Sequence, residues 1–311
     1  MQSAPLYADV ADGPPGGQAF WCRTEDGVRI RLGVWPNGPH RSHGTVLLLP
    51  GRSEYVEKYG RLARDLARHG LALLAVDFRG QGLADRLLAD RNIGHVGRFT
   101  DYQFDVAAAL QAARALGLPE PFFLLAHSMG GCIGLRALVG GLAVRAAAFS
   151  APMWGMNLNP ALRLVVSTLA KLARLSGLAA RYAPGTGPVS YVISAPFADN
   201  VLTSDPDMFA YMQAQVRTHP ELGLGGPSLN WLHEALGEMR YLRSAPLPGL
   251  PVLTAIGQCE RVIDPGAVHA MMARWPAARF QLIEGSEHEM IMETPAIRAR
   301  FLQAALQVFG L

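Results

Sequence analysis

Residues 124–131 decide the fold, and they read Leu124-Leu125-Ala126-His127-Ser128-Met129-Gly130-Gly131. An apolar strand pattern runs directly into a small-x-Ser-x-Gly turn and then into a helical pattern, which is the context of a nucleophile elbow. On so sharp a turn the residues two positions on either side of Ser128 must be small, and Ala126 and Gly130 are. Alanine is a mild departure, because glycine is usual at that position. The alternative interpretation is an ordinary strand, turn and helix with a capping serine.

Strand and helix patterns alternate on both sides of this turn. Residues 28–35 alternate with period two, which predicts an antiparallel strand exposed on one side. Apolar runs predict buried parallel strands at 45–49, 72–76, 122–126 and 146–149, and further strands at 252–256 and 279–283. Helical patterns occur at 56–69, from 100 onward, at 265–275 and at 295–309. The alternation predicts an α/β fold with a mostly parallel, doubly wound sheet.

The rhythm changes in the middle of the chain, where helix-like segments and Pro/Gly-rich joints replace clear buried strands. We therefore expect a core made of residues 1–151 and 241–311, with a mostly helical insertion at 152–240. One pattern in the insertion, at 162–174, is apolar on one face and basic on the other. Such a helix either packs as a lid over a site or rests on an anionic membrane surface, and the two interpretations are compatible.

Composition excludes several classes of protein. Half of the 311 residues are hydrophobic and the formal net charge is +3, which excludes intrinsic disorder. The longest charge-free stretches are broken by proline, so we expect no membrane-spanning helix. The arginines are dispersed among acids, which argues against a nucleic-acid partner. The first residues lack the pattern of a signal peptide, and this favours a cytoplasmic location, with peripheral contact to the inner membrane face through the insertion as an option.

The cysteines and glycine motifs give no sign of a metal or cofactor. Cys22, Cys132 and Cys259 are far apart and form no CxxC, so we expect small buried thiols rather than a disulfide framework or a zinc site. Residues 77–82 contain a GxG but no GxGxxG, which leaves dinucleotide binding unsupported and favours a structural loop beside the site. No P-loop or metal-ligand spacing appears, and the prediction is an activity without cofactor or metal.

A nucleophilic serine needs a base that is oriented by a carboxylate. After a nucleophile elbow these partners follow in the order acid, then histidine, at the ends of later strands. His288 follows the strand at 279–283 and is the predicted general base, whereas His127 is expected to be structural. Glu260 and Asp264 both follow the strand at 252–256, and spacing does not choose between them.

Two backbone N–H groups are the predicted oxyanion donors. One belongs to Met129, directly after the serine, and the other comes from the loop at 50–54, which follows the first parallel strand. Gly51 would let the backbone approach the substrate closely, and the N–H of Arg52 is the expected second donor. The alternative interpretation of Pro50-Gly51 is a plain turn.

Together these stretches resemble a known family. The chain is similar to serine hydrolases of the α/β-hydrolase fold, and within them to the bacterial lysophospholipase and monoacylglycerol-lipase-like group. The stretches that carry the resemblance are 48–59, 77–82, 126–131, 150–153 and 285–289, and 225–232 resembles a segment of the family's cap. The likeness spans about residues 20–310. It implies an α/β-hydrolase core with a helical cap at 152–240.

The resemblance also bears on the site. The family's Gly-x-x-acid-basic pattern falls on Glu260-Arg261 and favours Glu260 over Asp264 as the acid, although many relatives carry aspartate there. Pro50 stands where the usual oxyanion motif has histidine, and this leaves the backbone donor role intact. The implied activity is hydrolysis of the carboxylic ester of a single-acyl lipid, a lysophospholipid or a monoacylglycerol, through an acyl-enzyme. The implied partner is this small lipid, and nothing in the sequence predicts an oligomeric state.

Three other functions stay open. A short-chain carboxylesterase or thioesterase would use the same elbow. A serine aminopeptidase-like hydrolase would need a carboxylate in the insertion to bind the substrate amine, and Asp199, Asp205 and Asp207 are available. A non-catalytic ligand-binding protein on this fold would usually have lost part of the catalytic set, whereas a full set of candidates is present here.

Overall fold

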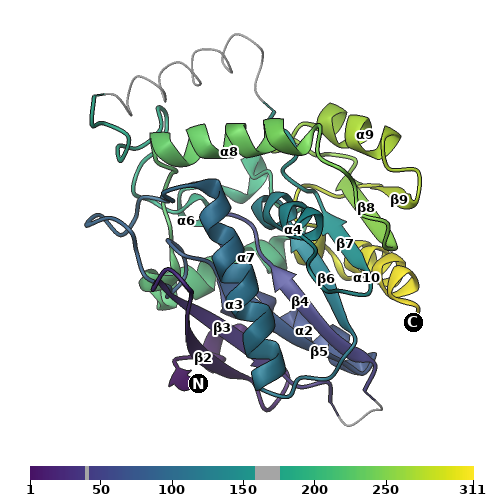
Figure 1. The fold of residues 1–311 in the computed structure, drawn as a ribbon. Coiled ribbons are helices and arrows are strands. Elements are labelled where there is room, and N and C mark those ends of the chain that lie inside the picture. The colour runs from purple at the N-terminus through teal and green to yellow at the C-terminus, as the bar shows by residue number, and fades with distance from the viewer. Residues whose placement is uncertain (39–41, 158–175) are drawn as a thin grey trace.

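The structure is a computed structural model that describes residues 1–38, 42–157 and 176–311. Nine strands in these residues form one sheet in the spatial order β1-β2-β3-β5-β4-β6-β7-β8-β9 (Figure 1). The strands are β1 (Gln2–Ala4), β2 (Gln18–Arg23), β3 (Arg29–Trp35), β4 (Gly44–Leu49), β5 (Leu71–Asp77), β6 (Phe122–His127), β7 (Ala147–Ser150), β8 (Val252–Gly257) and β9 (Ala278–Ile283). Every residue of β4 to β7 is buried, so these strands form the centre of the core.

The sheet has an antiparallel edge and a parallel body. β1, β2, β3 and β5 pair antiparallel in that order, while β5, β4, β6, β7, β8 and β9 pair in parallel. The predicted mostly parallel sheet is therefore confirmed. Because parallel strands end at the same edge, the loops after β4, β6, β8 and β9 are brought together there.

Helices cover both faces of the sheet. The helices of the core are α1 (Ala8–Ala11), α2 (Gly60–Arg68), α3 (Tyr102–Ala115), α4 (Met129–Val139), α9 (Pro265–Ala273) and α10 (Pro295–Phe309), with short 3-10 turns η1 (Val56–Tyr59), η2 (Phe99–Asp101) and η5 (Met290–Met292). The connection from β4 to β5 runs along the sheet in the opposite direction to that from β5 to β6. Right-handed crossovers therefore put α2 on the face opposite to α3 and α4, and in Figure 1 α3 lies in front of the sheet with α2 behind it.

A long segment without a described strand connects β7 to β8. Its described helices are α6 (Tyr191–Ser194), η3 (Phe197–Asp199), α7 (Pro206–Thr218), η4 (Pro220–Leu222) and α8 (Leu229–Leu242). Asp205 caps α7 by accepting from Asp207 N–H, and Ser228 caps α8 by accepting from Trp231 N–H, so polar side chains define both helix starts. The amphipathic pattern predicted at 162–174 lies outside the described residues. Within the described part, no helix is both long and apolar enough to cross a membrane.

One exposure prediction is wrong. The period-two pattern of residues 28–35 predicted a strand exposed on one side, yet six of the seven residues of β3 are buried. Arg31 explains the difference, because its guanidinium lies 2.7 Å from a carboxylate oxygen of Glu57 and 2.7 Å from one of Asp77. A charged side chain can be buried when its hydrogen bonds and charge are satisfied.

The cysteines are also less uniform than expected. All are free thiols, as predicted, but only Cys132 is buried, while Cys22 is half-buried and Cys259 is exposed. Cys259 lies in the loop after β8, where the chain turns at the protein surface rather than entering the core. The strands β1 and β2 were not predicted, because β1 has only three residues and β2 exposes both of its end residues.

Candidate active site

Ser128 stands between the end of β6 and the start of α4, with φ 49° and ψ −115°. Residues other than glycine rarely adopt a positive φ, and such strained positions often carry function. The turn also passes very close to β4, because a Cβ on Gly130 would lie 2.0 Å from the Leu49 carbonyl oxygen. Glycine is therefore required at position 130, where a small residue was predicted.

The structure brings Ser128, His288 and Glu260 together. His288 Nε2 lies 2.9 Å from Ser128 Oγ, and His288 Nδ1 lies 2.7 Å from Glu260 Oε2. Because a carboxylate can only accept a hydrogen bond, Nδ1 carries the hydrogen and Nε2 is left to accept from the serine hydroxyl. This order of contacts allows the histidine to take the serine proton while the carboxylate fixes its orientation.

Glu260 is prepared as the acceptor of that bond. Its second oxygen, Oε1, accepts from the backbone N–H groups of Val262 at 2.7 Å and Ile263 at 3.1 Å. Burial alone would raise the pKa of Glu260, but the hydrogen bond and charge of His288 and these two N–H groups lower it overall. The carboxylate therefore stays ionised beside the imidazole.

Asp264, the alternative acid, has a different role. Its carboxylate accepts from Gly266 N–H at 2.9 Å and caps the first turn of α9. Three residues separate the two acids, and the carboxylate that lies against His288 is that of Glu260.

Both predicted oxyanion donors lie at the same site. Arg52 and Met129 line the cavity that contains Ser128. The loop that carries Arg52 is fixed by its neighbours, because the N–H of Gly51 donates to Glu54 Oε2. The arrangement therefore has the parts that an acyl-transfer site needs, namely a serine, an oriented base and nearby backbone donors.

Residues 77–82 flank the site as a structural loop. The amide of Gln81 donates to the carbonyl oxygens of Gly51 at 2.9 Å and Glu54 at 3.3 Å. Asp77 accepts from Val56 N–H at 2.8 Å and from Leu83 N–H at 2.8 Å. The loop after β5 thus holds the loop after β4 in place.

A cavity of about 440 Å³ opens at Ser128 and His288. Polar residues of the core loops line one part of it, with Asn157, Ser190 and Tyr191 of the segment between β7 and β8, and the rest of the wall is mostly apolar. The apolar side chains come from both the core and the segment between β7 and β8, and they are Met129, Met153, Met156, Val192, Val201, Leu202, Pro227, Trp231, Leu232, Val262 and Ile263. A pocket of this kind suits an acyl chain whose ester end reaches the serine.

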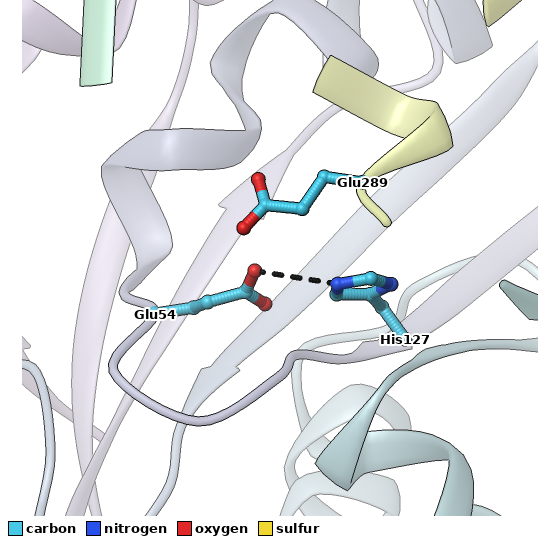
Figure 2. Close-up of side chains that lie close together, drawn as sticks. All are labelled: Glu54, His127 and Glu289. Carbon is cyan, nitrogen blue, oxygen red and sulfur yellow. Dashed lines mark ion pairs between the residues drawn. The ribbon is translucent and has the colours of Figure 1, made fainter. Parts of the chain in front are cut away.

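A buried cluster of charged side chains packs beside His288, and we refer to Glu54, Lys58, His127 and Glu289 as the charged cluster. Lys58 Nζ lies 2.6 Å from Glu54 Oε1 and 2.6 Å from Glu289 Oε2. His127 Nε2 is 3.7 Å from Glu54 Oε1 (Figure 2), and its ring centroid is 4.9 Å from that of His288. Burial would raise the pKa of Glu54, but the charge and hydrogen bond of Lys58 lower it to about 2.

His127 is a neutral structural residue in this arrangement. Burial lowers its pKa to about 4 despite the nearby Glu54 carboxylate. Its Nδ1 lies 3.0 Å from the Ser150 carbonyl oxygen, which can only accept, so Nδ1 carries the hydrogen. The bond ties the end of β6 to the end of β7 and steadies the turn at Ser128.

Three members of the charged cluster have the residue types of a metal site. The ligand atoms of Glu54, His127 and Glu289 all lie within 4.8 Å of one another. Lys58 already places its ammonium group between the two carboxylates, so a metal ion would have to displace it. The cluster fits a buried ion-pair network better than a metal centre. Sequence reasoning missed it, because no spacing pattern links Lys58 to a partner 231 positions away.

Comparison with known proteins gives close relatives in sequence. A family model described as serine aminopeptidase, S33 matches residues 40–295. Lysophospholipase L2 of Escherichia coli strain K12 is 34% identical over 276 residues, which are 85% of this chain and 80% of that protein. The probable lysophospholipase L2 of Haemophilus influenzae is 29% identical over 263 residues, 83% of this chain and 81% of that protein.

Solved structures agree in fold. A soluble variant of monoglyceride lipase from Saccharomyces cerevisiae, in complex with a substrate analogue, aligns with a TM-score of 0.71 and 21% identity over 92% of this chain and 93% of that one. A thermostable carboxyl esterase from Bacillus coagulans aligns with a TM-score of 0.74 and 15% identity over 96% and 99%. Fold and site together define an α/β-hydrolase. Within this class, the chain belongs to the serine aminopeptidase S33 family.

Proposed function

We propose that this protein, a carboxylic ester hydrolase, releases the fatty acid of a single-acyl lipid, a lysophospholipid or a monoacylglycerol, through an acyl-enzyme. The observation that carries the proposal is the hydrogen-bonded series Ser128–His288–Glu260 at the mouth of a mostly apolar cavity. The names of the sequence relatives, which include lysophospholipase L2 and a monoglyceride lipase, support the substrate class.

The reaction proceeds in two half-reactions. Ser128 Oγ attacks the ester carbonyl carbon while His288 Nε2 takes its proton, and the carbonyl π electrons move onto the oxygen to give a tetrahedral oxyanion. Collapse of this species breaks the bond to the glycerol oxygen, which leaves with the proton from His288. A water molecule then gives its proton to His288, attacks the acyl-serine and releases the fatty acid, with the proton returned to Ser128.

The protein supplies charge stabilisation at two points. The N–H groups of Met129 and Arg52 hydrogen-bond the oxyanion, and each such donor is worth about 3 kcal/mol in the transition state. Glu260 stabilises the imidazolium that forms on His288 and keeps its tautomer correct. Neither half-reaction requires a cofactor.

The segment between the two parts of the core forms the lid of this site. We assign residues 1–151 and 241–311 to the hydrolase core and residues 152–240 to a helical cap. In support, Val192, Trp231 and Leu232 of this segment line the cavity beside Ser128. The prediction that the cap touches a membrane depends on the pattern at 162–174 and stays a prediction.

The aminopeptidase alternative lacks support at the cavity, because the described carboxylates that line it, those of Glu54 and Glu289, are already paired with Lys58. An aminopeptidase needs an anionic group within reach of the substrate amine, and the candidates were Asp199, Asp205 and Asp207. None of them is among the described residues that line the cavity. Asp205 instead caps α7, where it accepts from Asp207 N–H at 2.9 Å.

Parallel substrate assays test the proposal. Wild type and Ser128→Ala are compared for fatty-acid release from lysophosphatidylcholine, a monoacylglycerol and a short p-nitrophenyl ester. We expect serine-dependent release from at least one of the two lipids, faster than from the short ester. Activity on the short ester alone would keep the mechanism and overturn the lipid assignment. Activity on an aminoacyl substrate alone would favour the peptidase.

A further inference from the structure

Two cationic side chains line the cavity beside Ser128, and their surroundings differ. Lys58 lies between the carboxylates of Glu54 and Glu289, 2.6 Å from each, so its charge is already compensated. Arg52 has no carboxylate partner among the residues that the structure describes. Its Nη1 donates a hydrogen bond to the carbonyl oxygen of Gly225 at 2.8 Å.

Three other arginines in the described chain, buried or half-buried, have more partners for their guanidinium groups. Arg31 and Arg79 each pair with two carboxylates. Arg86 donates instead to the carbonyl oxygens of Gly80, Gly82, Glu221 and Gly223. A guanidinium group has five N–H donors. Arg52 therefore keeps unused donors and an uncompensated charge at the substrate cavity.

Arg52 remains charged and fixed in place. Burial lowers the pKa of its guanidinium to about 10, which still leaves it protonated at neutral pH. The group lies 5.8 Å from the ring centroid of Trp231 and bonds to Gly225, so two residues of the segment between β7 and β8 hold it against the core. A planar, preorganised cation of this kind matches a phosphate in a bidentate geometry.

We propose that Arg52 binds the phosphate diester of a lysophospholipid headgroup and thereby favours phospholipid over neutral single-acyl substrates. The inference rests on the proposed function and names the substrate class for the same site. In a lysophospholipid the short glycerol backbone separates the ester from the phosphate. In the protein one side chain separates the backbone N–H of Arg52, the proposed donor to the ester oxygen, from its guanidinium group. A single residue can thus bind both the ester oxygen and the phosphate of one substrate.

Binding without turnover tests this directly. In a Ser128→Ala background, we compare affinity for an ether-linked lysophosphatidylcholine analogue and for a 1-alkylglycerol with the same chain, both below their micelle-forming concentrations. Arg52→Gln should lower the ratio of the two affinities by about tenfold or more, because a charge-assisted pair is lost. Arg52→Lys should give a smaller fall, since it keeps the charge without the planar fork.

The control variant removes the same charge elsewhere. Arg240→Gln lies at an exposed position of α8, and it should leave the affinity ratio unchanged. An unchanged ratio in Arg52→Gln, with the fold verified by thermal unfolding, would overturn the proposal. So would an equal fall in Arg240→Gln, because that would indicate a general charge effect. Inorganic phosphate should not displace the ether lipid at equal concentration; displacement would show a free-anion site and overturn the headgroup assignment.

The binding readout also separates this inference from the proposed function. If wild type released no fatty acid from either lipid but the Arg52-dependent affinity ratio persisted, the hydrolysis proposal would fail and the phosphate site would stand. If both lipids were hydrolysed but the affinity ratio did not change in Arg52→Gln, the hydrolysis proposal would stand and the phosphate site would fail.

Discussion

Two parts of the site are stabilised by different forces. One is the edge of the sheet that carries Ser128, His288 and Glu260, which we call the reactive edge. The other is the cavity wall formed by the segment between β7 and β8. At the edge, Ser128, His288 and Glu260 are joined at 2.9 and 2.7 Å by directional hydrogen bonds. The wall presents apolar side chains such as Val192 and Leu232, whose contacts have no preferred direction. A change at the edge should therefore remove function steeply, whereas a change in the wall should alter it gradually.

Removal of the nucleophile should have the largest effect. Ser128→Ala deletes the group that forms the acyl-enzyme, and kcat should fall at least about 10⁴-fold, as expected when one member of a triad is lost. The measurement is fatty-acid release under saturating substrate, with thermal unfolding as a check on the fold. Residual activity within tenfold of wild type would contradict a catalytic role for this serine.

The two acids of the loop after β8 sharpen the comparison. Glu260→Gln should lower kcat by about 10³–10⁴-fold, because the tautomer and charge support of His288 are lost. Asp264→Ala removes the cap of α9 and should cost about 1 kcal/mol of unfolding free energy, with kcat within a few-fold of wild type. Steady-state kinetics and urea unfolding of both variants show which acid acts on His288. The assignment fails if Asp264→Ala is the slower enzyme.

The buried His127 should make stability depend on pH. Its pKa is about 4 in the folded protein and near 6.5 when unfolded, so the unfolded chain binds the extra proton between these values. Stability contributed by the neutral ring is then present above pH 6.5 and declines as pH falls towards 4, by about 3 kcal/mol in total. Urea unfolding of wild type and His127→Gln measures this, and wild type should lose stability relative to the variant. If the unfolding free energies of wild type and variant changed with pH in the same way, the assignment of a neutral, buried His127 ring would be contradicted.

A change in the apolar wall should have the smallest effect. Leu232→Phe adds volume to the cavity and should lower kcat/KM for long-chain substrates less than about tenfold, while a short ester is little affected. Leu236→Phe, one turn further along α8 and absent from the cavity lining, is the matched control. A series of acyl-chain lengths gives the measurement. A uniform loss for every chain length would show that the wall affects the reactive edge rather than chain length.

The same contrast explains what sequence could predict. The turn at Ser128 and the strand β6 that precedes it are local patterns, because a strained turn restricts its neighbours and a buried strand needs continuous apolar residues. The C-terminal helix has the bounds that its pattern predicted, residues 295–309. Spacing left Glu260 and Asp264 open, since only the folded loop shows which carboxylate faces the histidine.

Contacts between distant parts of the chain were beyond local patterns. The exposure predicted for residues 28–35 was wrong because Arg31 finds both of its carboxylate partners on other elements. The charged cluster was missed for the same reason, as Lys58 joins Glu54 to a residue near the other end of the chain. The sequence predicted that the backbone N–H of Arg52 is an oxyanion donor. Only the structure showed that its side chain lacks a carboxylate partner among the described residues.

Covalent labelling tests the central claim most directly. The protein is treated with a long-chain fluorophosphonate, with and without lysophosphatidylcholine as competitor, and the modified peptide is mapped by mass spectrometry. We predict a single adduct on Ser128, which slows in the presence of the lipid and is absent from Ser128→Ala. No adduct, or an adduct on another residue that the lipid does not affect, would contradict a lipid-directed serine hydrolase at this site.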